Sequence, residues 1–397
     1  MAEGDRMKET IFNYINEITS ELLGMSDYIF DNPELAFEEF KAAEILTNYL
    51  EENGFNVELG LGTLKTAFRA VYENGVGGPT IGLLCEYDAL EGMGHACAHQ
   101  MQGPSIVGAA LSIKNVLIDK PYKLIVYGTP GEEGGGGKIT MLKEGYLTDI
   151  DVALMMHGGP ATQTDVKSMA STSISVTFHG ESAHAALKPE LGRSALDALL
   201  LTFHGLEILR EHVLEDTRMH YTVIDAGGPS NVVPAKAVGS FNLRSYNSAY
   251  LKDVVRRFEK IVEGASLMTE TTYEVEIEKT LESKIPVYKL NELLMSNAEL
   301  IDAPTRRIAR EKTGSTDFGN VTYLLPGSCI RVAFVDENLS SHSLDFINDG
   351  KSERGHAAVI TAAKILAGTT FDVINNPDIV KEIQDEFKST KEKMMMH

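Results

Sequence analysis

The chain has 397 residues, more than one hydrophobic core usually holds, and this length predicts two domains. Its 57 acidic residues exceed its 36 basic residues and give a formal net charge of -21, which argues against nucleic acid or an anionic membrane as a partner. No apolar run reaches the length of a membrane span, the first residues lack the apolar core of a signal peptide, and Cys85, Cys97 and Cys329 fit reduced thiols, so we expect a cytoplasmic protein.

The first part of the chain alternates between helical and strand patterns. Apolar residues repeat at helical spacing over 11–22, and a second helix is predicted over 42–50. Buried strands and helices follow in turn, with strands predicted at 80–87, 123–130 and 151–157 and helices at 104–117 and 138–145. Continuous apolar strands separated by helices are typical of a mostly parallel sheet sandwiched by helices, so we predict an α/β domain over residues 1–169.

The pattern changes near residue 171. Its segments are a strand at 171–180, a helix at 192–212, strands at 218–228 and 236–245, a helix at 248–266 and a strand at 272–281. This β-α-β-β-α-β order is that of a ferredoxin-like layer. We therefore predict that residues 170–283 form an inserted ferredoxin-like domain and that residues 284–397 complete the first domain. The last part would contribute a strand at 328–335, a helix at 353–368 and a frayed tail at 391–397.

Side chains that bind metals follow three of the strands predicted in the first domain. Cys97 and His99 come soon after the first strand, Glu132 and Glu133 directly after the second, and His157 directly after the third. In open α/β sheets, ligands bind beyond the carboxyl ends of the strands. A lone cysteine is more often a buried hydrophobe and a lone histidine a structural polar group, but the joint placement at three strand ends favours a metal site.

The two adjacent glutamates lie in a glycine-rich stretch, PGEEGGGGK, that also invites comparison with a phosphate-binding loop. The spacing fails that motif because Ile139, rather than serine or threonine, follows Lys138, and two carboxylates would repel phosphate. A carboxylate pair instead suits amide hydrolysis. One glutamate can bind metal while the other takes a proton from water and delivers it to the leaving nitrogen.

Seven motifs, taken in order, resemble the aminoacylase and carboxypeptidase G metallopeptidase family. They are GHACAHQ, PGEEGGGGK, MMHGGP, FHGESAHAALKPELGRSALDAL, GGPSNVVP, GSTDFG and HSLDF, and they span nearly the whole chain. Within the family, the likeness is to the amidohydrolase branch of p-aminobenzoyl-glutamate hydrolase, indoleacetyl-amino-acid hydrolases and related dipeptidases. The resemblance implies a hydrolase with two divalent metal ions per subunit and an inserted domain that acts as a lid and dimerises. Mn²⁺ or Zn²⁺ suits the donors, and Co²⁺ or Ni²⁺ is chemically compatible.

The resemblance also assigns roles to individual residues. The implied metal ligands are Cys97, His99, Glu133, His157 and His342. Glu132 matches the general base and acid, and His184 matches a histidine that assists the reacting carbonyl oxygen, often from the neighbouring subunit in dimeric members. Asn231 and Arg244 match positions that hold the substrate's carboxylate or carbonyl. From the residues alone, His184 could be an exposed loop residue, Asn231 a turn residue before Pro234, and Arg244 a surface charge.

The ligand loop departs from the pattern of the branch at two positions. Ala98 stands where the branch has glycine, and Gln100 stands where it has an acidic residue or asparagine. If position 98 requires a positive φ, alanine strains the loop, and Gln100 would move a hydrogen bond that orients a ligand. Asp88 and His95 flank the loop and are candidates for outer contacts to the ligands, with a purely structural role as the alternative.

Together these features predict a homodimeric, metal-dependent amidohydrolase that cleaves an N-acyl amino acid, an aminobenzoyl-glutamate-like compound or a dipeptide. Two alternatives stay open. The altered loop could mark a one-metal hydrolase of a different C–N bond, such as that of an aromatic amine. The chain could instead be a non-catalytic paralogue that binds small molecules.

Overall fold

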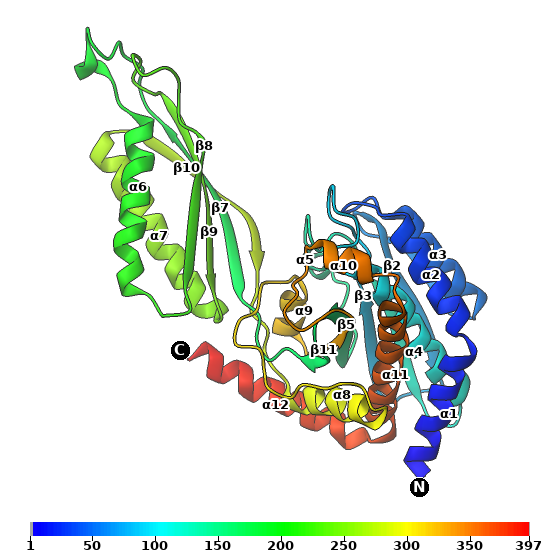
Figure 1. The fold of residues 1–397 in the computed structure, drawn as a ribbon. Coiled ribbons are helices and arrows are strands. Elements are labelled where there is room, and N and C mark those ends of the chain that lie inside the picture. Colours follow the sequence, from blue (N-terminus) through cyan, green and yellow to red (C-terminus); the bar gives the residue numbers. More distant parts are fainter. Residues whose placement is uncertain (1–2, 397) are drawn as a thin grey trace. The chain divides into compact units, whose positions relative to one another are not determined.

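The computed structural model describes residues 3–396, and its contacts divide the chain into two compact units. Unit 1 contains the residues up to Val166 together with Ile285–Thr313 and Asn320–Glu392. Unit 2 contains Lys167–Lys284, Gly314–Gly319 and the residues from Lys393 onward. Each unit has its own sheet covered by helices (Figure 1).

Unit 1 is built on a seven-stranded sheet in the order β1-β2-β4-β3-β5-β11-β6. The strands are β1 (Asn56–Leu61), β2 (Leu64–Asn74), β3 (Thr80–Cys85), β4 (Tyr122–Gly128), β5 (Val152–Gly159), β6 (Gln163–Thr164) and β11 (Gly327–Ala333). The neighbours from β4 through β3 and β5 to β11 are parallel, whereas β1, β2 and β6 add antiparallel pairs at the edges. The parallel sheet expected from the apolar runs is therefore the centre of this sheet. The sequence patterns did not reveal its antiparallel edges.

Helices cover the sheet of unit 1. They are α1 (Glu3–Glu17), α2 (Thr19–Asp31), α3 (Phe40–Glu52), α4 (Gln102–Val116), α5 (Gly137–Lys143), α8 (Tyr288–Leu300), α10 (Leu344–Asp349), α11 (Glu353–Asn375) and α12 (Pro377–Met395), with α9 (Phe318–Leu324) at the boundary between the units. Helix α4 is almost wholly buried because α1, α2 and α11 pack on it. Its Gly108 permits this close approach, since a Cβ atom there would lie 2.7 Å from Leu22 of α2 and 3.2 Å from Ala363 of α11. The packing fixes the amino end of α4, where the ligand loop enters.

Two expectations at the chain ends were wrong. The apolar repeat over 11–22 continues through two helices rather than one, because Ile18 leaves the helical conformation with φ -99° and ψ 12°. The tail expected at 391–397 is helical through Met395 as the end of α12, and His397 lies outside the described residues. Packing against the rest of the fold explains the order, since Ile379, Ile383 and Phe387 of α12 are buried.

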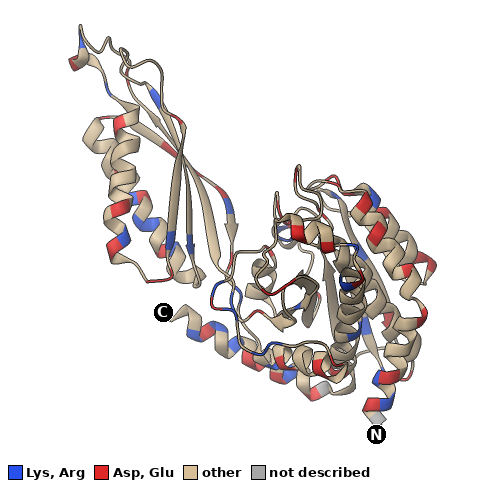
Figure 2. Cartoon of the chain, in the orientation of Figure 1, with Lys and Arg blue, Asp and Glu red and all other residues tan. Residues whose placement is uncertain are grey.

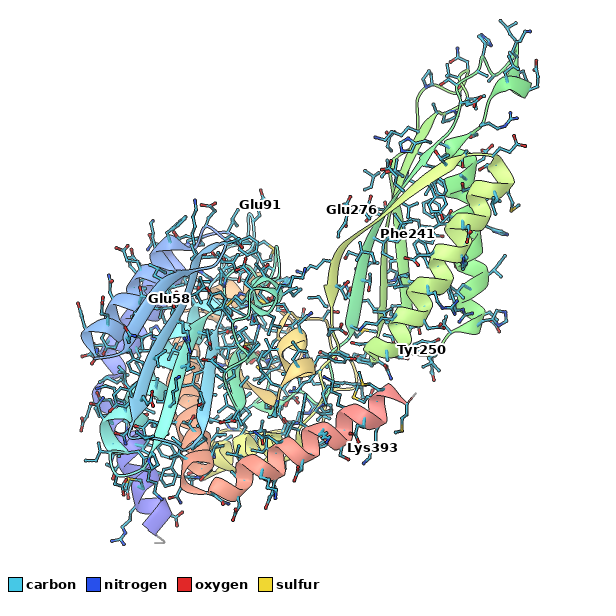
Figure 3. All side chains as sticks on the ribbon, turned by 180° about the vertical axis from the view of Figure 1, so that it is seen from behind. Glu58, Glu91, Phe241, Tyr250, Glu276 and Lys393 are labelled. Atoms are coloured by element: carbon cyan, nitrogen blue, oxygen red, sulfur yellow. The ribbon has the colours of Figure 1, made fainter. Side chains whose placement is uncertain are left out.

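Unit 2 is a ferredoxin-like layer with the sheet order β10-β7-β9-β8. Its elements are β7 (Ala170–His179), α6 (Ala195–Leu209), β8 (Arg218–Asp225), β9 (Lys236–Ser245), α7 (Ser248–Thr269) and β10 (Thr272–Leu281), with short 3₁₀ turns at Pro189–Leu191 and Arg210–His212. Strand β9 alternates buried and half-buried residues, as expected for a sheet with one face covered by helices. Phe241 of β9 points toward those helices, with its ring 4.7 Å from that of Phe258 of α7, whereas Glu276 of β10 is exposed (Figure 3).

The surface and one core helix bear on the expected partners. Acidic and basic side chains alternate along the outer helices α7 and α12 (Figure 2). Among the described residues, α11 alone is long and apolar enough to cross a membrane, and 72% of its most apolar window is buried inside the fold. Burial of that kind is typical of the core helix of a globular domain.

Candidate metal centre

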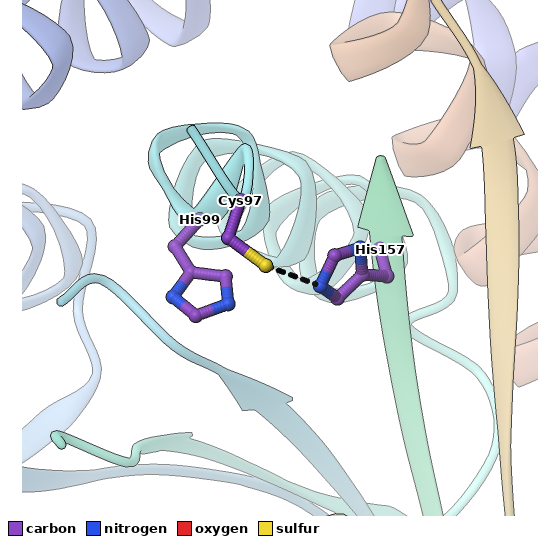
Figure 4. Close-up of side chains that lie close together, drawn as sticks. All are labelled: Cys97, His99 and His157. Atoms are coloured by element: carbon purple, nitrogen blue, oxygen red, sulfur yellow. Dashed lines mark hydrogen bonds between the residues drawn. The ribbon is translucent and has the colours of Figure 1, made fainter. Parts of the chain in front are cut away.

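The ligand loop brings Cys97 and His99 to the carboxyl ends of the parallel strands. The loop leaves β3 at Cys85 and re-enters the fold through a 3₁₀ turn, His99–Met101, that leads into α4. Ala98 adopts the left-handed conformation, with φ 61° and ψ 27°, and this reversal directs the side chains on either side of it to one region. Cys97 Sγ lies 3.6 Å from His157 Nε2 at the end of β5, and the rings of His99 and His157 are 5.5 Å apart (Figure 4).

Hydrogen bonds orient both imidazoles so that one nitrogen of each faces the others. His99 Nδ1 lies 3.0 Å from the carbonyl oxygen of Asp88 and 3.1 Å from its Oδ1, so Nδ1 carries the proton and Nε2 keeps its lone pair. His157 Nδ1 donates to the carbonyl oxygen of Gly158 at 2.7 Å, which leaves Nε2 facing Cys97. His99 Nε2 is buried and has no hydrogen-bond partner among the described residues, although Glu86 Oε2 lies 3.3 Å away. A buried lone pair of this kind fits a metal ion.

Glu133 and His342 extend the cluster on the other side of Cys97. Glu133 receives a backbone constraint, because its N–H donates to Asp88 Oδ2 at 2.9 Å. His342, also left-handed at φ 64°, donates its N–H to the carbonyl oxygen of Ala96 and places Nε2 3.1 Å from Glu133 Oε1. The structure therefore gathers residues that lie far apart in the sequence.

Three overlapping groups of donor atoms lie within 4.8 Å of one another. They are Cys97–His99–His157, Cys97–Glu133–His342 and His99–Glu132–Glu133. Because the first two groups share Cys97, the donor set has the composition for two ions that share one thiolate. Thiolate, imidazole and carboxylate together suit zinc or manganese. All five proposed ligands and Glu132 belong to unit 1.

The protonation states are compatible with metal binding. Burial lowers the pKa of His157 to about 3, with Arg331 adding to the effect, so its imidazole is neutral. Burial raises the pKa of the Cys97 thiol to about 12, so this sulfur becomes a thiolate only beside a cation. Burial also lowers the pKa of His99, but the Cys97 sulfur and the Asp88 carboxylate outweigh it and raise the pKa well above its ordinary value.

A buried ion pair behind these donors was missed by sequence reasoning. Lys138 Nζ donates to Glu86 Oε1 at 2.6 Å, and Gln102 Nε2 donates to Glu86 Oε2 at 2.7 Å. Burial raises the pKa of Glu86, but Lys138 and His99 outweigh it and hold the pKa at about 2. The sequence offered one signal, a charged residue directly after a fully apolar strand. It did not identify the partner.

A second charged cluster, also unforeseen, flanks His157 on the neighbouring strand. Arg331 of β11 is in register with His157 of β5, and its Nη1 lies 3.4 Å from His157 Nδ1. Arg331 Nε donates to Asp165 Oδ2 at 2.7 Å, and Arg310 binds both oxygens of Asp165 at 2.8 Å. Asp165 thereby fixes the guanidinium beside the imidazole.

The residues expected to make outer contacts divide into two groups. Asp88 contacts both His99 and the backbone of Glu133, as described above. His95 instead donates or accepts at the carbonyl oxygen of Ile29, stacks on Phe30, and has its pKa lowered to about 4 by burial, all of which fits a structural role. Gln100 Nε2 donates to the carbonyl oxygen of Gly350 rather than to a proposed ligand.

The three residues expected in the inserted domain belong to unit 2. His184 is exposed, and its Nδ1 accepts from the N–H groups of Ala186 and Leu187. The N–H of Ala185 donates to the carbonyl oxygen of Asn231 at 3.0 Å, so His184 and Asn231 lie at one end of the sheet. Arg244 lies near the other end of β9 and donates to Asn242 Oδ1 at 2.6 Å. Within this unit, Arg244 is therefore separate from the other two.

Known proteins share these features. The family described as a peptidase dimerisation domain matches residues 167–268. The chain is 31% identical to one of the two chains of the p-aminobenzoyl-glutamate hydrolase of Escherichia coli, over 94% of this chain and 93% of that protein. It is 30% identical to the Xaa-Arg dipeptidase of Homo sapiens, over 94% of this chain and 90% of that protein. Its fold is similar, with a TM-score of 0.72 and 20% identity, to a Bacillus subtilis protein described as a dinuclear metal-binding peptidase of the M20 family, covering 91% of this chain and 99% of that one.

Proposed function

The chain belongs to the M20 peptidase family, and on that premise we propose that this metallo-amidohydrolase cleaves the amide bond of an N-acyl amino acid, an aminobenzoyl-glutamate-like compound or a dipeptide. The observation that carries the proposal is the convergence of Cys97, His99, Glu133, His157 and His342 within one unit, beside a second glutamate. Full-length similarity to an aminobenzoyl-glutamate hydrolase and to a dipeptidase supports these substrate classes.

We propose that the five ligands hold two divalent ions, Mn²⁺ or Zn²⁺, and that Glu132 is the general base and acid. Ions bound there supply Lewis acidity, which lowers the pKa of water and polarises the scissile carbonyl. Glu132 takes the proton of the attacking water and then delivers it to the departing amine nitrogen. Glu132 suits this role because it lies with His99 and Glu133 within 4.8 Å and is half-buried, so it is reachable by substrate.

The inserted domain is proposed to complete the site in a homodimer. The match to a peptidase dimerisation domain supports self-association, and the edge strand β8 exposes Tyr221, Val223 and Ile224, which a partner strand could cover. His184 would donate to the developing oxyanion, and Asn231 would hold the substrate's carboxylate or carbonyl. Arg244 is the third substrate-binding proposal. The acidic composition and three free, buried cysteines support a cytoplasmic location.

Replacement of Glu132 with glutamine tests this function. Protein loaded with manganese or zinc is assayed with p-aminobenzoyl-glutamate, N-acyl amino acids and dipeptides, and its metals are counted per chain. We expect the variant to retain its metals and lose turnover by at least about 10²-fold, because it cannot accept the proton. Glu91→Gln, at an exposed position, serves as the matched control. Full activity of Glu132→Gln would remove Glu132 from this role.

A further inference from the structure

A short segment of the amino-terminal part, residues 34–39 between α2 and α3, touches both loops that carry proposed ligands. The N–H of Ala89, in the loop after β3, donates to the carbonyl oxygen of Glu34 at 2.8 Å. The N–H of Gly131, in the loop after β4, donates to Glu39 Oε1, also at 2.8 Å. The segment therefore joins two loops that come from different strands.

Phe37 forms the packing surface for the glycine-rich loop. It adopts the left-handed conformation at φ 68°, and its ring fills the space that a side chain at Gly131 or Gly135 would need. A Cβ atom at Gly131 would lie 2.6 Å from Phe37 Cε1. The loop then turns back on itself, because the N–H groups of Gly135 and Gly136 both donate to the carbonyl oxygen of Gly131. Gly131 is thus the residue from which the whole turn is held.

Glu39 is the only charged side chain that the described residues place on the Gly131 N–H. Its side chain is 0% exposed, and its second oxygen accepts from Thr66 Oγ1 of β2 at 2.8 Å. Residue 131 immediately precedes Glu132, and the N–H of the residue after Glu132 donates to Asp88 Oδ2. The backbone is therefore anchored on each side of Glu132 by a buried carboxylate.

We propose that Glu39 is a positioning residue for the glutamate pair, acting through its hydrogen bond to the Gly131 amide. The proposal rests on the function proposed for Glu132 and adds a residue that lies outside the ligand set. Glu39 does not reach the donor atoms. It fixes the turn that presents Glu132 and Glu133, and a misplacement of about 1 Å at a reacting group is sufficient to cost about 10²-fold in rate.

The test uses variants that separate the hydrogen bond from the volume of the side chain. Glu39→Met keeps the volume and removes both acceptors, whereas Glu39→Gln keeps one amide oxygen that can accept from Gly131. Thr66→Val removes only the second contact of Glu39. Glu38→Met is the matched control, because Glu38 is the exposed neighbour on the same segment.

Two measurements are made on the full chain. The first is hydrogen exchange of the peptide covering residues 129–137 in metal-free protein, which reports the order of the turn without any activity. The second is kcat and KM with zinc or manganese and p-aminobenzoyl-glutamate, or a dipeptide ending in arginine if that is the one hydrolysed. For Glu39→Met we expect faster exchange in this peptide and a kcat lower by about 10- to 100-fold, with KM within about twofold, as for residues that orient a metal site from outside.

We further expect Glu39→Gln and Thr66→Val to stay within several-fold of the wild-type kcat and Glu38→Met to match it. Unchanged exchange of residues 129–137 in Glu39→Met would overturn the proposal, even where Glu132→Gln behaves as proposed. A loss of activity equal in Glu39→Met and Glu39→Gln would also overturn it, because the amide oxygen should rescue the contact. Full activity of Glu132→Gln would instead refute the proposed function and leave the exchange result to decide the role of Glu39 in the turn.

Discussion

Lys138→Met would expose how much the buried ion pair contributes to the fold behind the metal centre. Lys138 Nζ and Glu86 Oε1 are 2.6 Å apart, and the two side chains are 0% and 1% exposed. Methionine keeps much of the lysine stem but leaves the Glu86 carboxylate buried without its lysine. Removing one partner of a buried ion pair is strongly destabilising, and we expect a loss of about 3–5 kcal/mol in the free energy of unfolding.

The size of this loss should depend on pH. In the wild type the pKa of Glu86 is about 2, because Lys138 and His99 outweigh the effect of burial. Without Lys138 that pKa rises, and protonation at low pH then neutralises the buried carboxylate. A group whose pKa in the folded state lies above its unfolded value loses stability as pH rises, so the deficit should be larger at pH 8 than at pH 5.

Urea unfolding of metal-free protein, followed by circular dichroism because the chain has no tryptophan, measures this difference. The double variant Glu86→Gln/Lys138→Met should be more stable than Lys138→Met alone, since it buries no unpaired charge. A loss below about 0.5 kcal/mol at pH 8, the size of an ordinary surface substitution, would refute the reasoning.

Three further predictions concern the same unit. Burial raises the pKa of Glu39 to about 7, so its contribution to stability is present below about pH 4.5 and is lost as pH rises through 7; Glu39→Gln should gain up to about 3 kcal/mol relative to the wild type between pH 5 and pH 8, and parallel unfolding curves at the two pH values would contradict this. Ala98→Gly should raise the free energy of unfolding by about 0.5–1 kcal/mol, because relief of about 1–2 kcal/mol at φ 61° exceeds the entropy cost of glycine; urea unfolding that shows a loss would indicate an unstrained loop. Zinc at 100 times its Kd should stabilise the fold by about 3 kcal/mol, and His342→Ala should reduce this gain in thermal unfolding with and without chelator.

Much of the fold followed from the sequence wherever one face or both faces of an element are buried. The bounds predicted for β9 and β10 agree with the structure, because regular alternation and flanking turns mark each strand. The strands β1 and β2 were not predicted. Strand β2 mixes buried, half-buried and exposed residues without alternation, since it pairs with β1 on one side and β4 on the other, and such burial depends on tertiary neighbours.

The candidate site divides in the same way. The carboxyl ends of parallel strands meet at one edge, so the approach of Cys97, His99 and His157 could be expected from three strand ends. His342 follows no strand end directly and was reached only through the resemblance. Glu39 and Lys138 were overlooked for another reason. A buried charge is recognised by the partner that the fold gives it, and the sequence pattern does not identify that partner.

Asp88 connects the two halves of the proposed metal centre. Its Oδ1 and carbonyl oxygen orient His99, while its Oδ2 holds the backbone of Glu133, so one carboxylate sets the position of a ligand in each donor group. Burial raises the pKa of Asp88, but its contacts with His99 outweigh this and lower the pKa below its ordinary value, which keeps both oxygens available as acceptors. Because the two donor groups also share Cys97, a shift of the loop that carries residues 88–99 displaces both at once. The geometry therefore behaves as one unit, whose alignment depends on the loop after β3 and on the glycine-rich turn that Asp88 and Glu39 hold from opposite sides of Glu132.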